Sequence, residues 1–206
     1  TINVSVDNIF PLIKKFLYSD HEIFLRELIS NATDATLKMK HLANIGEAEG
    51  VEYGNPKIEV ILDKEKKQLR ITDQGIGMTK EEVEKYINEI AFSGAEEFIE
   101  KYKDKDGKDA GIIGHFGLGF YSAFMVAEKV EIITKSYKDE PAVHWTCDGS
   151  PEFTLEKADK KERGTEIILH IAEDSTEFLE ENRISELLVK YNKFMPIPIK
   201  FGTRTE

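Results

Sequence analysis

The chain has 206 residues, of which 40% are hydrophobic and 33% charged, and its formal net charge at pH 7 is −11. This length fits one domain with a sizeable core, and the acidic balance disfavours binding to a nucleic-acid backbone, which needs clustered Lys and Arg. The single cysteine, Cys147, excludes a disulfide framework and a cysteine-based zinc site, and we expect it to be a small buried hydrophobe.

Helical patterns dominate the first half of the chain. Apolar residues at helical spacing predict helices over residues 7–18, 22–41 and 79–91, a Glu-rich helix over residues 95–103, and another helix over residues 120–127. Between the second and third of these, alternating apolar residues predict a β-hairpin from residues 58–63 and 68–72, joined by a charged turn.

Strand patterns dominate the second half. Short strands separated by Gly, Pro or Asp are predicted over residues 130–136, 142–147, 152–157 and 165–172, and a last helix over residues 176–194. Helices and strands are therefore segregated, with no regular βαβ alternation. This order indicates an α+β fold, a mixed or antiparallel sheet covered by helices.

The sequence also indicates where the protein is located in the cell and whether residues 1–206 belong to a longer chain. No apolar run reaches the roughly 18–20 residues that span a bilayer, and no signal-peptide pattern opens the chain. We therefore expect a cytoplasmic domain that binds no membrane. Since no Met stands at residue 1 and no obvious terminal pattern precedes Glu206, we expect residues 1–206 to be one domain of a longer protein.

Four polar side chains share one face of the helix predicted over residues 22–41. At about 100° per residue, they fall within a narrow arc; they are Glu27, Asn31, Asp34 and Lys38. A solvated helix face with an Asp–Lys pair explains this arc without any function. The alternative is a binding site, because an Asn amide oxygen is a usable Mg²⁺ ligand and a Glu one turn away can orient or deprotonate a water.

An acidic turn follows the second strand of the hairpin, where residues 73–78 read DQGIGM. An ordinary strand–turn–helix connection explains these residue types, since Gly and Asp are common in turns. As a binding site, the Asp73 carboxylate would accept a hydrogen bond from an exocyclic amine. Gly77 and Met78 would then line the base that carries this amine.

A glycine-rich stretch precedes the helix over residues 120–127, where residues 111–120 read GIIGHFGLGF. Backbone N–H groups at a helix N-terminus bind anions, whereas the alternative is a flexible surface loop. The stretch is no P-loop, because no Gly-Lys-Ser/Thr ends it, and its glycine spacing does not fit a dinucleotide fingerprint. Of the 5 histidines, only His115 lies in such a stretch and is a candidate for function.

These three constellations occur in an order and at spacings that resemble the heat shock protein 90 chaperone family. The similarity rests on residues 24–32 (FLRELISNA), 73–79 (DQGIGMT) and 114–122 (GHFGLGFYS), and residues 163–165 (RGT) look like the family's fourth nucleotide motif. The resemblance covers essentially the whole chain as the family's N-terminal ATPase domain, and it is strongest to the bacterial members.

The resemblance implies a two-layer α/β sandwich of the Bergerat type, shared with gyrase B, histidine kinases and MutL, that binds ATP or ADP with Mg²⁺. It implies Glu27 as the group that activates water and Asn31 as the ligand of Mg²⁺ and phosphate. Asp73 would bind the adenine amine, helped by Thr165 through a water, and residues 92–119 would form a lid. The implied nucleotide-binding residues are Asn31, Asp34, Lys38, Asp73, Gly77, Met78, Gly114, Phe116, Gly117, Gly119, Phe120 and Thr165.

The resemblance also implies a biological role. ATP binding and slow hydrolysis would drive the conformational cycle of a chaperone that acts on client proteins. Since the family's middle domain supplies a catalytic Arg, the domain alone should turn over slowly and stay monomeric, while the full-length protein would be a homodimer. Two alternatives remain: a nucleotide-gated protein-interaction module with negligible hydrolysis, and the ATPase domain of a topoisomerase or mismatch-repair protein, which the charge of −11 disfavours.

The chain departs from the usual family pattern at a few positions. Tyr86 and Asn88 lie where the family usually has Asn-Leu-Gly-Thr or His-Leu-Gly-Thr, Phe92 stands in place of a Lys, and His115 in place of a Gln. These changes remove a polar contact on the ribose side and a positive charge near the phosphates. We expect them to alter affinity and lid behaviour and to leave the binding mode unchanged.

Overall fold

The structure, a computed structural model, describes residues 21–48, 51–85, 119–148, 153–192 and 195–204. The helices predicted over residues 7–18 and 95–103, and the end of the helix predicted over residues 79–91, lie outside the described residues. Within the described part of the chain, no helix is both long enough and apolar enough to cross a membrane.

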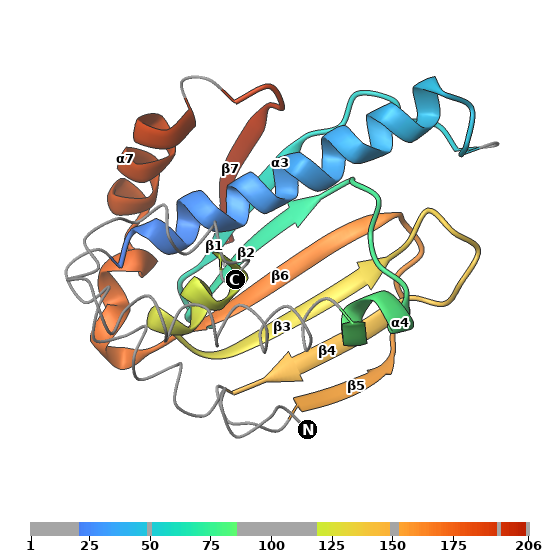
Figure 1. The fold of residues 1–206 in the computed structure, drawn as a ribbon. Helices are drawn as coiled ribbons and strands as arrows, with labels where there is room; N and C mark the ends of the chain where they lie inside the picture. The colour runs from blue at the N-terminus through green and yellow to red at the C-terminus, as the bar shows by residue number, and fades with distance from the viewer. Residues whose placement is uncertain (1–20, 49–50, 86–118, 149–152, 193–194, 205–206) are drawn as a thin grey trace, which may run out of the picture.

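The described strands form one mixed sheet in the order β5-β4-β3-β6-β2-β1-β7 (Figure 1). Its strands are β1 (Ile58–Asp63), β2 (Gln68–Asp73), β3 (Ala127–Lys135), β4 (Val143–Cys147), β5 (Phe153–Lys157), β6 (Gly164–Ile171) and β7 (Ile199–Arg204). All described neighbours pair antiparallel except β1 and β7, which pair parallel. The predicted hairpin and mainly antiparallel sheet are confirmed, whereas β7 was not predicted, since Pro196 and Pro198 precede it.

The described helices lie over one face of this sheet, and α3 runs in nearly the same direction as β2 and β6 (Figure 1). They are α3 (Ile23–Asn44), α4 (Lys80–Val83), the 3₁₀ helices η2 (Gly119–Met125) and η3 (Glu173–Leu179), and α7 (Glu181–Asn192). Thr79 caps α4, where its hydroxyl accepts from the Glu82 amide while Glu82 accepts from the Thr79 amide. One helical layer on one sheet is the predicted two-layer architecture.

Two predicted helices differ from the structure. In place of a helix over residues 120–127, η2 ends at Met125, because Val126 already accepts a hydrogen bond from the Ala172 amide and Ala127 pairs with Ile171. In place of one helix over residues 176–194, the chain forms η3 and α7, with an extended residue, Glu180, between them. In both cases, residues that the apolar pattern assigned to a single helix instead connect two different elements of the structure, where tertiary contacts override the local helical pattern.

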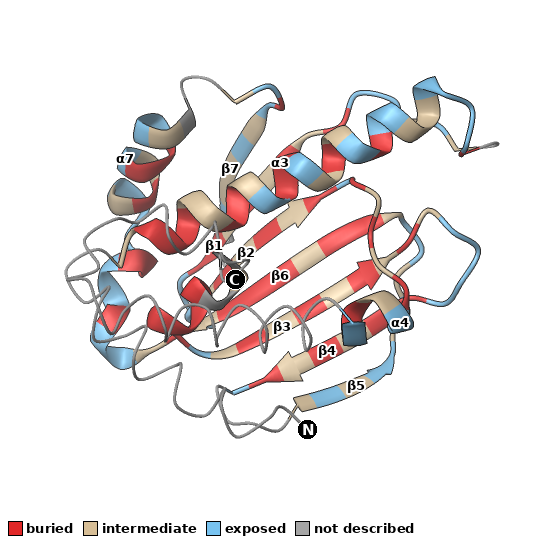
Figure 2. Cartoon of the chain, in the orientation of Figure 1, coloured by how far each residue is buried: buried red, intermediate tan, exposed pale blue. Residues whose placement is uncertain are grey.

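The core lies between the sheet and α3, where buried residues gather on the facing sides of both layers (Figure 2). Phe24 of α3 meets Phe178 of η3 edge to face, with ring centroids 5.0 Å apart. Trp145 of β4 is only 1% exposed, and Cys147 is buried, as predicted. Each such side chain contributes roughly 1.5–3 kcal/mol through burial, so this layer contact holds α3 at a fixed position over the sheet.

The N-terminal end of α3 is tied to α7 by charges around Glu22. Its carboxylate accepts hydrogen bonds from Arg183 at 3.0 Å, Lys190 at 2.7 Å and the Tyr191 hydroxyl at 2.9 Å. The bond from Lys190, together with those from Tyr191 and Arg183, lowers the pKa of Glu22 from 4.5 to about 2. The ion pairs therefore stabilise the folded state as long as Glu22 is ionised in it.

We expect Glu22→Gln to destabilise the domain by about 1 kcal/mol at pH 7, a value reduced by solvent around the pair. Because the folded pKa is depressed, this contribution is complete above pH 4.5 and is lost as the pH falls toward 2. Urea unfolding at pH 7, 4.5 and 3.5 measures it. The control is Glu180→Gln, whose ion pair with Lys64 is largely exposed; an equal loss in both variants would contradict the prediction.

Candidate functional site

The polar face of α3 carries the four residues that the sequence placed on one arc. Asn31, Asp34 and Lys38 are exposed, while the Glu27 side chain is only 13% exposed and accepts a hydrogen bond from Arg26 at 3.1 Å. The apolar arc faces the core, with Leu25, Leu28, Ile29 and Ala32 buried. This separation of faces confirms the predicted amphipathic helix.

Asp73 is buried at the end of β2, beside the start of β6. One carboxylate oxygen accepts from the Gly75 amide at 2.8 Å, and the Thr165 amide also donates to the carboxylate. Burial raises the pKa of Asp73 from 3.8 to about 7, against the opposing effect of these two amides. A buried carboxyl group whose pKa is raised this far is uncommon, and groups with strongly shifted pKa values are found preferentially at functional sites.

The turn after Asp73 docks on the middle of α3. The Ile76 amide donates to the Ala35 carbonyl at 3.1 Å, and a Cβ added at Gly75 would stand 2.5 Å from the Ala35 carbonyl carbon. Only glycine allows this approach. Since Ala35 follows Asn31 by about one helical turn, the end of β2 lies beside the segment of α3 that carries Asn31.

The rest of the turn is fixed by β3 and β6. Gly77 has φ +63°, and a Cβ there would stand 2.0 Å from the Lys135 carbonyl oxygen. The Met78 amide donates to the Thr134 hydroxyl at 2.9 Å, and the Thr134 and Thr165 hydroxyls are 2.8 Å apart. The structure therefore places Thr165 of β6 beside the turn that carries Asp73, Gly77 and Met78.

Thr134 is a member of this cluster that the sequence analysis missed. It is fully buried on β3, on the side of the strand that also carries Val130 and Ile132. A hydroxyl in this apolar alternation needs a partner, and that mismatch is the signal that could have identified it. Its oxygen connects the turn to β6.

The glycine-rich stretch is only partly described. Gly114, His115, Phe116 and Gly117, like the lid and the departures at Tyr86, Asn88 and Phe92, lie outside the described residues. Gly119 begins η2, and the Phe120 ring packs against Trp145 at 5.7 Å and Phe124 at 6.4 Å between centroids. The Phe120 ring is thus packed in the core, so a contact of Phe120 with phosphate would be made by its main-chain atoms.

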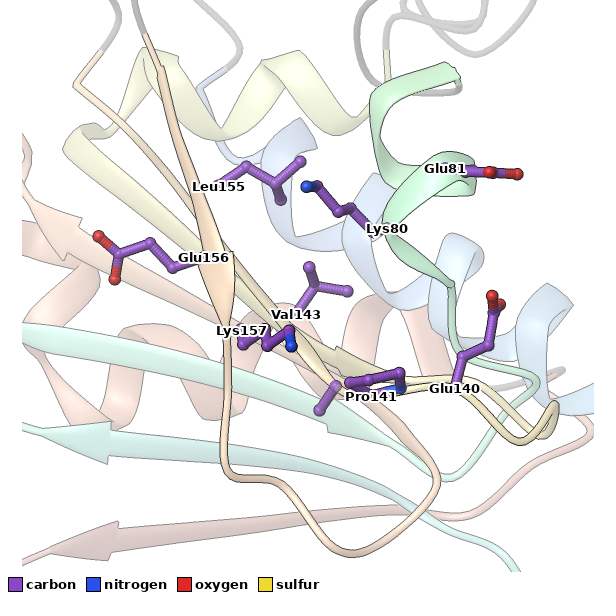
Figure 3. A pocket seen from close by; sticks show the side chains of 9 residues that line it. Lys80, Glu81, Glu140, Pro141, Val143, Leu155, Glu156 and Lys157 are labelled. Carbon is purple, nitrogen blue, oxygen red and sulfur yellow. The ribbon is translucent and has the colours of Figure 1, made fainter.

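A pocket of about 290 Å³ lies elsewhere, between α4 and the strands β4 and β5 (Figure 3). Val143, Leu155 and Pro141 give it an apolar lining, and Lys80 reaches across it. None of the predicted site residues lines this pocket. It is a separate feature of the sheet edge.

No group of three or more His, Cys, Asp or Glu side chains in the described part of the chain could hold a metal ion. A structural metal site made of protein ligands alone is therefore not found there. Mg²⁺ in a nucleotide site needs less, because phosphate oxygens and water fill most positions and one or two protein oxygens suffice. The exposed Asn31 amide fits that requirement.

The comparison with family models defines the class of protein. Residues 18–180 match the histidine kinase-, DNA gyrase B- and HSP90-like ATPase family, so the chain belongs to this family. The match spans α3, the Asp73 turn, η2 and β6, and it confirms the Bergerat-type fold implied by the resemblance.

The chain is also similar to individual proteins of this family, which are bacterial chaperone proteins named HtpG. The chain is 65% identical over 206 residues to a chaperone protein HtpG of Bacteroides thetaiotaomicron and 60% identical over 207 residues to one of Porphyromonas gingivalis, in both cases across 100% of the chain. An HtpG of Nitratidesulfovibrio vulgaris is 44% identical over 95% of the chain. The chain spans about 30% of the length of these relatives (29%, 30% and 32%). The resemblance to bacterial members of the heat shock protein 90 family is thereby confirmed.

Proposed function

We propose that residues 1–206 are the N-terminal nucleotide-binding domain of a longer chaperone, and that this domain binds ATP and hydrolyses it slowly. The observation that carries the proposal is the buried Asp73 carboxylate, held in a glycine turn that docks on α3 one turn from Asn31. Membership of an ATPase family and similarity to HtpG chaperones support it.

The cluster around Asp73 suits recognition of adenine. The carboxylate would accept from the exocyclic amine of the base, and the Thr165 hydroxyl, already 2.8 Å from that of Thr134, would act through a water. Gly77 and Met78 would line the ring. A carboxylate rejects guanine in this position, because guanine presents a carbonyl oxygen where adenine presents the amine.

The α3 face would bind the triphosphate end. Asn31 would hold Mg²⁺ and phosphate, while Asp34 and Lys38 lie on the same exposed face. Glu27 would orient or deprotonate the attacking water once it is released from Arg26, which now bonds to it at 3.1 Å. Mg²⁺, when bound, neutralises phosphate charge, and residues 114–120 would complete the phosphate site.

Two variants separate binding from turnover. Glu27→Gln should leave the ADP dissociation constant within about twofold and reduce ATP hydrolysis at least 100-fold, because it removes only the base. Asn31→Ala should weaken ADP with Mg²⁺ by about tenfold or more, because it removes a ligand. Calorimetric titration and a phosphate-release assay measure these effects. Unchanged turnover in Glu27→Gln would instead favour the nucleotide-gated interaction module.

The wider role is a proposal drawn from the relatives. The full-length protein would be a cytoplasmic homodimer that acts on client proteins, with the following domain completing the ATPase site, whereas the domain alone would be monomeric. Addition of duplex DNA should leave ATP hydrolysis unchanged, since the net charge of −11 disfavours a DNA-dependent member of the family. Stimulation by DNA would contradict this role.

A further inference from the structure

The Arg163 side chain donates three hydrogen bonds to the turn that follows Asp73. Its Nε donates to the carbonyls of Gln74 and Gly75, each at 3.2 Å, and its Nη2 donates to the Gln74 carbonyl at 3.1 Å. Its Nη1 donates to the Glu52 carbonyl at 3.2 Å. One guanidinium therefore joins the loop before β1 to the turn after β2.

The strand register explains why Arg163 reaches this turn. Asp73 pairs with Thr165 across β2 and β6, so the chain two residues before Thr165 runs beside the residues that follow Asp73. Gly164, at φ +125°, allows the crossing, because a Cβ there would stand 2.1 Å from the Asp73 carbonyl oxygen. The position of Arg163 beside the turn therefore follows from the pairing of β2 with β6 and from the glycine at residue 164.

We propose that Arg163 is a positioning residue for purine recognition, because its guanidinium fixes the backbone of the turn that holds Asp73 and places a positive charge near the Asp73 carboxylate. This inference rests on the proposed function. It adds a residue that acts through Asp73 and need not touch the nucleotide. A forked guanidinium suits this role, since it can satisfy several carbonyls that a single ammonium cannot.

The charges around Asp73 agree with this role. Burial raises the pKa of Asp73, and the Gly75 and Thr165 amides, then Lys160 and then Arg163 lower it by decreasing amounts. Burial lowers the pKa of Arg163, and the charges of Tyr53 and Asp73 raise it. From α3, the charged residues next to the docking point are Asp34 and Lys38, and both are exposed. Arg163 is the cation that combines charge with direct contacts to the turn.

The test is the pH dependence of ADP binding with Mg²⁺, measured by calorimetry from pH 5.5 to 9. In the unaltered chain, affinity should rise with pH through about 7, because the adenine amine selects the ionised form of Asp73. In Arg163→Met this rise should move to higher pH, and affinity at pH 7 should fall by about tenfold. Arg163→Lys should return the rise toward its original pH and recover only part of the affinity.

The matched control is Arg70→Met, which removes an arginine of β2 whose hydrogen bonds go to Glu166 of β6 at 2.8 Å and to Gln68 of β2 at 3.0 Å, and not to the turn after Asp73. It should leave both the affinity and the pH profile unchanged. Carbon-13 NMR titration of the Asp73 carboxyl without nucleotide gives a second readout, in which Arg163→Met should raise the pKa and Arg163→Lys should restore it.

The outcomes separate this inference from the proposed function. ADP binding by the unaltered chain, with the same affinity and pH profile in Arg163→Met, would overturn the role of Arg163 alone. An unchanged Asp73 titration in a folded Arg163→Met variant would do the same. If the unaltered chain bound no ADP at any pH, the proposed function would fail, and the inference that rests on it would fail as well.

Discussion

Asp73→Asn is expected to abolish the binding of adenine nucleotides and, at the same time, to make the free domain more stable at neutral pH. The amide keeps an oxygen that can accept from the Gly75 amide, which is 2.8 Å from the carboxylate. It removes the negative charge that burial disfavours and that the adenine amine requires. Function and stability should therefore move in opposite directions, as at other sites that keep an unfavourable group for function.

The sign of the stability effect follows from the raised pKa. The folded state binds a proton at Asp73 with a pKa of about 7, whereas the ordinary value is 3.8. Between these values the folded state holds more protons than the unfolded chain, so the stability of the unaltered domain falls as the pH rises. The penalty is complete above pH 7 and absent below pH 4.

We expect Asp73→Asn to gain roughly 2 kcal/mol at pH 8 and little at pH 4.5, less than the full penalty because the new amide leaves a buried N–H₂ group to satisfy. Chemical denaturation at the two pH values measures the difference, and calorimetry with ADP measures the loss of binding. Asp63→Asn is the control, a change at a buried aspartate that caps the β1–β2 turn through the Lys66 amide. Retained ADP affinity in Asp73→Asn would contradict the proposed function.

The features that the sequence predicted well are those with a strong local signal. The 22 residues of α3 show one apolar and one polar arc, and the structure keeps these arcs on opposite faces. The hairpin of β1 and β2 was predicted to within one residue, because its strands alternate and its turn is charged. In both cases the local pattern and the tertiary environment favour the same structure.

The features that the sequence did not predict depend on contacts between distant segments. The bond from Arg163 to the carbonyls of Gln74 and Gly75 joins residues 88 or 89 positions apart, and it exists only because β2 and β6 are paired in one register. The docking of Gly75 on Ala35 likewise requires the sheet and α3 to be assembled first. Motif spacing indicates which residues belong to a site, but it does not give these pairings.

Gly77→Ala should be among the most destabilising single changes in the described part of the chain. Gly77 has φ +63°, a conformation that side chains disfavour, and the added Cβ would stand 2.0 Å from the Lys135 carbonyl oxygen and 2.5 Å from its carbon. These atoms belong to the backbone of β3 and cannot turn away. We expect a loss of about 3 kcal/mol or more, measured by urea unfolding, and a displaced turn that no longer presents Asp73 and Met78 together.

Gly54→Ala separates the two causes of this loss, because Gly54 has φ +62° and no atom within 4 Å of an added Cβ. It carries the backbone cost alone, about 1 kcal/mol, so the difference between the variants measures the crowding against β3. We expect that difference to be at least about 2 kcal/mol, with ADP affinity retained in Gly54→Ala and lost in Gly77→Ala. Equal destabilisation by the two changes would mean that backbone conformation, and not the close packing of the turn on β3, determines the need for glycine at residue 77.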